Sequence, residues 1–238
     1  MIEIDLRNYA KEVRILCLAA KEFVAKESQA VLNGLGESLN YGLEQGDSFK
    51  WAIEKPLVTI PSEAYDGKGK SMPPARLSFQ FSSELEPAVW RRSKKGRKKG
   101  GDSACWKVMS MSTKMQIVSQ CSAAGFHVDL KNCEQWGPMV HFQFAESEEH
   151  GTGIPRIPFW ALLPTDCLDF GLSELFPGVW QKAQLSAFSI NSLRTSQARR
   201  LEAIADALRS GWKGSPFTPI AYLQDHPVHQ GLQFCFGT

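Results

Sequence analysis

In the stretch Leu77-Ser78-Phe79-Gln80-Phe81, large apolar residues alternate with polar ones. A period of two places alternate side chains on opposite faces of a β-strand. The stretch therefore predicts a strand with one buried and one solvated face, which is typical of an antiparallel sheet.

Two later stretches share this pattern, His141-Phe142-Gln143-Phe144 and Leu232-Gln233-Phe234-Cys235-Phe236. An internal duplication would explain the similarity. Chance convergence is the better explanation, because few residues match and any strand with one solvated and one buried face needs such alternation. Residues 49–53 and 126–130 also alternate and predict further strands.

Helical periodicity marks both halves of the chain. Apolar residues recur at three- and four-residue steps through the first 45 residues, which predicts helices there. We expect Gly34 and Gly36 to interrupt this region. A late helix is expected from Thr195 to about Gly211.

A helix is also expected in the middle of the chain. Ser112 or Thr113 can serve as its N-cap, and Gly125 as its end. Met115 and Ile117 lie in the segment between them.

These elements predict an α+β fold. N-terminal helices precede a largely antiparallel sheet with further helices packed on it, and runs at 217–223 and 231–236 suggest a C-terminal β-hairpin. We expect one domain spanning 1–238. Two lobes, 1–145 and 157–238, joined by a polar hinge at 146–156, are the alternative.

The net charge of +2 conceals an uneven distribution. Seven of the 27 basic residues lie between positions 91 and 99, where there is no acidic residue. The remaining 20 basic residues stand against 25 acidic ones, a balance of −5. No apolar run is long enough for a membrane helix, and the six scattered cysteines form no C-x-x-C pair. We expect a reduced, cytoplasmic protein, or a nuclear one in a eukaryotic cell.

The basic tract at 91–99 is the strongest functional signal. Clustered Lys and Arg neutralise phosphates and release counterions, and a neighbouring tryptophan can stack on a base. We therefore expect contact with nucleic acid or another polyanion. A solvated loop, a nuclear address and docking on an acidic protein are the alternatives. The candidate contact residues are Arg91, Arg92, Lys94, Lys95, Arg97, Lys98 and Lys99, with Trp90 and Trp106 as stacking partners.

A second hypothesis is a hydrolase or nuclease with a site that includes Asp225, His226 and His229. Two imidazoles beside a carboxylate can ligate a metal or relay a proton, although a polar turn explains the same residues. His127 and His141 are expected in the core or on a sheet surface, and capping is expected for Asp166. The sequence contains no hydrolase, metalloprotease or nucleotide-binding signature, so no catalytic residue, metal or cofactor is assigned.

The segment 159–180 is rich in aromatic residues and suggests a third role. Burial in the core is one explanation, and an adaptor surface for a protein partner is the other. Its candidate anchors are Phe159, Trp160, Phe170, Phe176 and Trp180. The preferred hypothesis remains a non-enzymatic binding protein that works in an assembly and contacts nucleic acid through residues 91–99.

Overall fold

The computed structural model describes residues 2–62, 74–88, 105–120, 123–130, 140–144, 157–158, 162–186, 190–213, 216 and 234–236. Strands β7 (Val140–Phe144), β8 (Ile157–Pro158) and β9 (Phe234–Phe236) are described by their backbone alone. The other elements, in chain order, are β1 (Ile2–Asp5), α1 (Leu6–Ala20), two 3-10 turns (Lys21–Phe23 and Lys26–Ser28), α2 (Gln29–Gln45), β2 (Phe49–Ala52), β3 (Leu57–Val58), β4 (Ala75–Pro87), β5 (Cys105–Ser119), β6 (Ala123–Leu130), α3 (Pro164–Leu175), α4 (Pro177–Ser186) and α5 (Ile190–Lys213).

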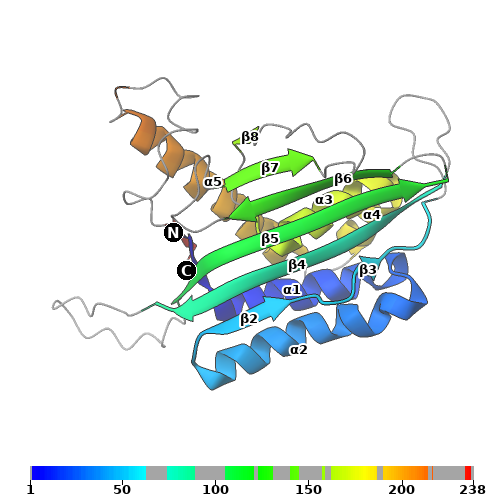
Figure 1. The fold of residues 1–238 in the computed structure, drawn as a ribbon, viewed down its shortest axis with the longest axis horizontal. Coiled ribbons are helices and arrows are strands. Elements are labelled where there is room, and N and C mark those ends of the chain that lie inside the picture. Colours follow the sequence, from blue (N-terminus) through cyan, green and yellow to red (C-terminus); the bar gives the residue numbers. More distant parts are fainter. Residues whose placement is uncertain are drawn as a thin grey trace, which may run out of the picture.

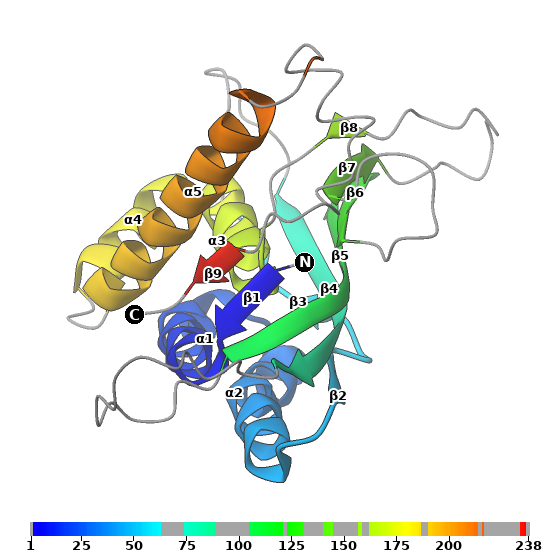
Figure 2. The same cartoon turned by 90° about the vertical axis from the view of Figure 1, so that its left-hand side faces the viewer.

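The α+β fold class is confirmed. Within the described residues, the main sheet follows the order β2-β4-β5-β6-β7-β8, with antiparallel neighbours throughout. Strand β1 pairs antiparallel with β5 and parallel with β9. The helices gather on one side of the sheet, as Figures 1 and 2 show.

Strand β4 has the two faces that its alternation predicts. Leu77, Phe79 and Phe81 are buried, whereas Ser78 and Gln80 are partly exposed on the other face. The adjacent α3 lies so close that a Cβ added at Gly171 would come within 2.6 Å of the Leu77 side chain. The apolar side of the sheet therefore forms the core with the helices.

The expected helix from Ser112 or Thr113 to Gly125 is wrong. These residues belong to β5 and β6, which pair with each other from Met111↔Leu130 to Val118↔Ala123. The buried residues Met111, Thr113 and Met115 follow a period of two, which is the periodicity of a strand with one buried face.

The expected interruption at Gly34 and Gly36 is also wrong, since α2 continues through both glycines. The break comes earlier, at the 3-10 turns between α1 and α2. There the Gln29 side-chain amide donates to the carbonyls of Lys21 and Val24 at 2.8 and 3.3 Å, so a side chain satisfies backbone acceptors where the helix stops. Residues 2–5, at the start of the predicted helical region, form β1 instead.

The two ends of the described chain meet in the sheet. Ile2, Glu3 and Ile4 pair with Phe234, Cys235 and Phe236, respectively. Residues 217–233, which include most of the predicted C-terminal hairpin, lie outside the described part. The predicted hinge at 146–156 lies outside it as well, so the division into lobes stays a prediction.

Helix α5 begins at Ile190, slightly before the expected Thr195, and ends at Lys213. Together with α1 and α3 it frames a cluster of buried polar side chains. Among the helices that the structure describes, none combines the length and apolar character needed to cross a bilayer.

Candidate functional site

The basic tract connects the two longest strands of the sheet. Residues 91–99 themselves lie outside the described residues, as does Trp90. The strands on either side are well defined: their last register pair is Pro87↔Trp106, and the Ala88 amide donates to the Cys105 carbonyl at 3.0 Å. The seven cations thus lie in the connection at the end of a long two-stranded ladder, whose register shifts once, between Glu84 and Leu85 (Figure 1).

Trp106, the other predicted stacking residue, is a core residue. It is 4% exposed, and its ring meets that of Phe49 edge-on, with centroids 5.3 Å apart. This burial argues against base stacking by Trp106, because stacking requires an open ring face.

The described residues at the base of this ladder contribute little net charge. Lys107 is the register partner of Glu3 on one side and Glu86 on the other, and Lys50 is the partner of Glu84. Opposite charges on paired residues partly cancel. Any strong positive potential at this end therefore comes from the tract itself.

The cations of α5 do not form a uniform basic face. Arg199 is exposed, and Arg209 forms a 2.6 Å ion pair with Asp206. Arg200 is 4% exposed and points into the protein. This helix therefore offers less free positive charge than its sequence suggests.

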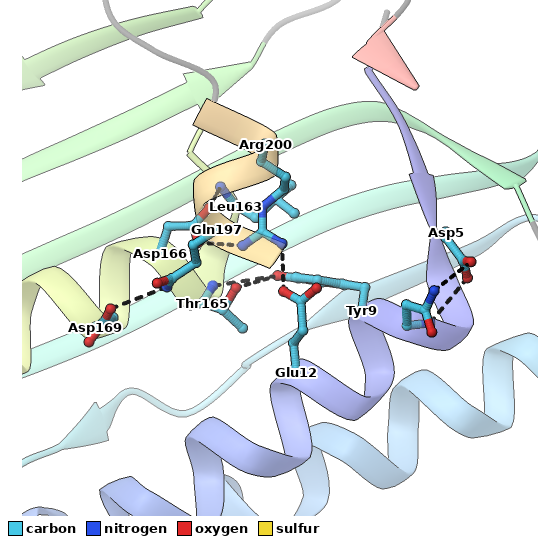
Figure 3. Close-up of polar contacts among 10 residues, drawn as sticks. Asp5, Tyr9, Glu12, Leu163, Thr165, Asp166, Asp169, Gln197 and Arg200 are labelled. Carbon is cyan, nitrogen blue, oxygen red and sulfur yellow. Dashed lines mark hydrogen bonds and ion pairs between the residues drawn. The ribbon is translucent and has the colours of Figure 1, made fainter. Parts of the chain in front are cut away.

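Arg200 joins three helices in a buried cluster, shown in Figure 3. Its Nη1 lies 2.5 Å from Glu12 Oε2 of α1, and its Nη2 lies 2.6 Å from Asp166 Oδ1 of α3. The other Asp166 oxygen accepts from the Leu163 amide at 3.0 Å, which confirms the predicted capping role. One guanidinium therefore serves two carboxylates that are almost completely removed from water.

Burial shapes the ionisation of this cluster. It raises the pKa of Glu12 above its usual range, and the attraction of Arg200 offsets that rise only in part. Desolvation alone would lower the pKa of Arg200, but Asp166 and Glu12 outweigh it, so the pKa is raised and the arginine stays charged. Burial also raises the pKa of Tyr9, whose hydroxyl accepts from the Thr165 hydroxyl at 3.2 Å.

Further hydrogen bonds extend the cluster along α3. Asp169 accepts from the Trp180 indole at 2.8 Å. It also accepts from the Gln197 side-chain amide at 3.2 Å (Figure 3). The side-chain contacts of this cluster connect helices to one another. The arrangement is therefore better explained by a structural role than by catalysis. The sequence offers one signal for it: Arg200 lies seven residues after the buried Leu193, on the stripe that α5 turns inward.

The predicted aromatic surface is largely core. Phe176 and Trp180 are 8% and 0% exposed, and both rings pack against Phe23. Phe170 is 48% exposed, although its ring contacts that of Phe126. Phe159 and Trp160 lie outside the described residues.

The outer face of the sheet carries a second polar site. His127 and Asp129 are two residues apart on β6, with His127 Nε2 3.3 Å from Asp129 Oδ2. On β7 the register partner of Asp129 is His141. Both histidines are thus on strands, and His127 lies on a sheet surface as predicted. The predicted alternative site at Asp225, His226 and His229 lies outside the described part of the chain.

Among the described side chains, no group of three or more His, Cys, Asp or Glu residues is placed to hold a metal ion. Among the cysteines whose side chains the structure describes, Cys17, Cys105 and Cys167 form no disulfide bond. Comparison with protein-family models, with curated proteins and with solved structures finds no match for this chain.

Proposed function

We propose that this protein binds nucleic acid through the seven cations of residues 91–99 as a non-enzymatic component of a larger assembly. The observation that carries the proposal is the concentration of charge. Seven basic residues without an acidic neighbour occupy one connection, whereas the rest of the chain has a balance of −5. A polyanion would be repelled elsewhere and attracted at this connection.

The ladder that carries the tract supports the proposal. Strands β4 and β5 pair from Ala75↔Ser119 to Pro87↔Trp106. At the end of the ladder next to the tract, the opposite charges of paired residues largely cancel. The ladder fixes both ends of the connection that contains the cations, at Ala88 and Cys105. Trp90 remains the candidate for base stacking, because Trp106 is committed to the core.

The test is the binding of labelled single-stranded and duplex oligonucleotides, followed by fluorescence anisotropy at several salt concentrations. Contact with four duplex phosphates predicts a slope of log K against log salt of roughly −3.6, so affinity should fall roughly 150-fold between 50 and 200 mM salt. Changing all seven cations to glutamine should remove this binding.

A matched control variant neutralises seven exposed cations elsewhere, Lys11, Arg14, Lys21, Lys26, Lys55, Arg76 and Lys182. It should retain most of the affinity, although its net charge equals that of the first variant. Equal losses in the two variants would show that overall charge, and not the tract, governs binding. An acidic polypeptide bound more tightly than either oligonucleotide would instead identify a protein ligand and overturn the proposal.

A further inference from the structure

The outer faces of α1 and α2 carry the two most exposed large apolar side chains that the structure describes. Leu18 of α1 is 68% exposed and Tyr41 of α2 is 66% exposed. The two helices run in opposite directions and lie side by side in the helical layer (Figures 1 and 2). They pack closely, since a Cβ placed at Gly36 of α2 would lie 4.0 Å from the Cβ of Arg14. Both apolar side chains therefore belong to one solvent-facing surface.

On α1 the exposed stripe that leads to Leu18 is basic. Arg7, Lys11 and Arg14 precede it at intervals of four and three residues, so the four side chains lie on one face of the helix. Glu12, the acidic residue of α1, faces the core instead, where it pairs with Arg200. The outward face of α1 therefore carries positive charge and one apolar side chain.

On α2 the exposed stripe is acidic. Glu37 and Glu44 are exposed, and Tyr41 lies between them at intervals of four and three residues. The two glutamates are seven residues apart, as Arg7 and Arg14 are on α1. Seven residues span two helical turns, about 10.5 Å. Antiparallel helices can therefore match both charges of one stripe with both charges of the other.

We propose that this surface is a dimer interface, in which α1 of one copy packs antiparallel against α2 of a second copy of the same chain. A two-fold rotation about an axis parallel to the helices places each α1 over the other copy's α2 and leaves heights along the axis unchanged. Arg14 is level with Gly36 in its own chain, so it faces Glu37 of the second copy, and Arg7 faces Glu44. Every contact then occurs twice, as a two-fold interface requires.

The exposed apolar side chains gain contacts in the same register. Tyr41 is opposite Lys11 of the second copy, where its ring covers the alkyl chain and meets the ammonium group. Leu18 is opposite Ala30 and Asn33, whose side chains are short. If α1 packed on α1, or α2 on α2, like charges would meet across the interface. The charges therefore favour the crossed arrangement.

The composition and size of the surface favour a second copy as its occupant. A polyanion is disfavoured, because Glu37 and Glu44 border the cations of α1 and would repel phosphate. The two helices together cover about 25 Å by 20 Å, so two copies would bury about 1,000 Å², the lower limit for a specific interface. We therefore expect a weak, concentration-dependent dimer. It uses no residue of 91–99, so it does not depend on nucleic-acid binding.

The test is sedimentation velocity of the full chain, freed of nucleic acid, over a series of protein concentrations. The wild type should pass from monomer to dimer as the concentration rises. Arg14→Glu and Glu37→Arg should each weaken the dimer by at least about 10-fold, because each change places like charges at two contacts. The matched control is Arg76→Glu, which reverses an exposed cation on β4 and should leave dimerisation unchanged.

Mixing the two interface variants distinguishes contacts between chains from effects within one chain. A chain with Arg14→Glu and a chain with Glu37→Arg regain opposite charges at both contacts, so the mixture should dimerise about as well as the wild type. This recovery would also show that each variant is folded. A wild type that stays monomeric, a dimer that Arg14→Glu leaves intact, or a mixture no better than its components would overturn the proposal.

Discussion

At the scale of single residues, Arg200 has the most unusual environment. A cation with 5% side-chain exposure can persist only where anions replace its hydration, and Glu12 and Asp166 do so at 2.5 and 2.6 Å. The cluster holds two carboxylates for one guanidinium. Its charges are therefore incompletely balanced; burial is the main cause of the raised pKa of Glu12, and the nearby Asp166 adds to it.

Arg200→Ala should lower the free energy of unfolding by about 3–5 kcal/mol, because it leaves two buried carboxylates without their partner. The matched control is Arg209→Ala, on the same helix, which breaks an exposed ion pair with Asp206. That change should cost about 0–1 kcal/mol. Urea unfolding followed by circular dichroism measures both values, and similar losses would contradict a special role for Arg200.

Glu12 predicts a specific dependence on pH. Its pKa in the folded protein is raised above the ordinary value of 4.5, so its contribution to stability is complete below that pH and is lost as the pH rises through the raised pKa. Between about pH 4.5 and neutrality, the wild type should therefore lose stability relative to Glu12→Gln. Urea unfolding at a series of pH values tests this. A wild type that gained stability over the variant would show that attraction to Arg200 outweighs the cost of burial.

At the scale of elements, α2 shows why glycines were a poor guide to helix ends. Gly34 and Gly42 both lie inside this helix, but in different surroundings. No atom lies within 4 Å of a Cβ placed at Gly34, whereas a Cβ at Gly42 would overlap the ring of Phe49. Gly42 therefore allows α2 to approach β2, and Gly34 has no such role.

These two glycines give a matched pair of substitutions. Gly34→Ala should stabilise the protein by up to about 1 kcal/mol, the usual difference in helix propensity. Gly42→Ala gains the same propensity but should destabilise the protein by about 1–3 kcal/mol, because the added methyl group displaces Phe49. Thermal unfolding compares them, and equal shifts of the two midpoints would show that α2 and β2 can separate without cost.

The sequence predicted elements best where a single periodicity ran uninterrupted. Residues 77–81 alternate strictly, and the strand was predicted. In β5 the apolar Ile117 and Val118 are adjacent, which resembles a helical face, and Ser112 and Thr113 resemble a cap. Pairing with β4 and β6 overrides these local signals, and such long-range pairing is not visible in a short window.

At the scale of the whole molecule, the sequence alone shows where basic residues are concentrated. It does not show which distant residues a given side chain contacts. The excess of seven cations at 91–99 was evident from composition. The burial of Arg200 and Trp106 was not, because each depends on residues far away in the chain: Glu12 lies 188 positions from Arg200, and Phe49 packs against Trp106. The pairing of His141 with Asp129 likewise required the strand register.

The Arg200 cluster also has a consequence for the order of assembly on the ribosome. Glu12 and Asp166 leave the exit tunnel before Arg200, so a nascent chain that has already packed α1 against α3 holds two like charges without a counter-ion. A translation product that stops before residue 200 would lack the cation that both carboxylates contact, the kind of defect that chaperones and proteases detect.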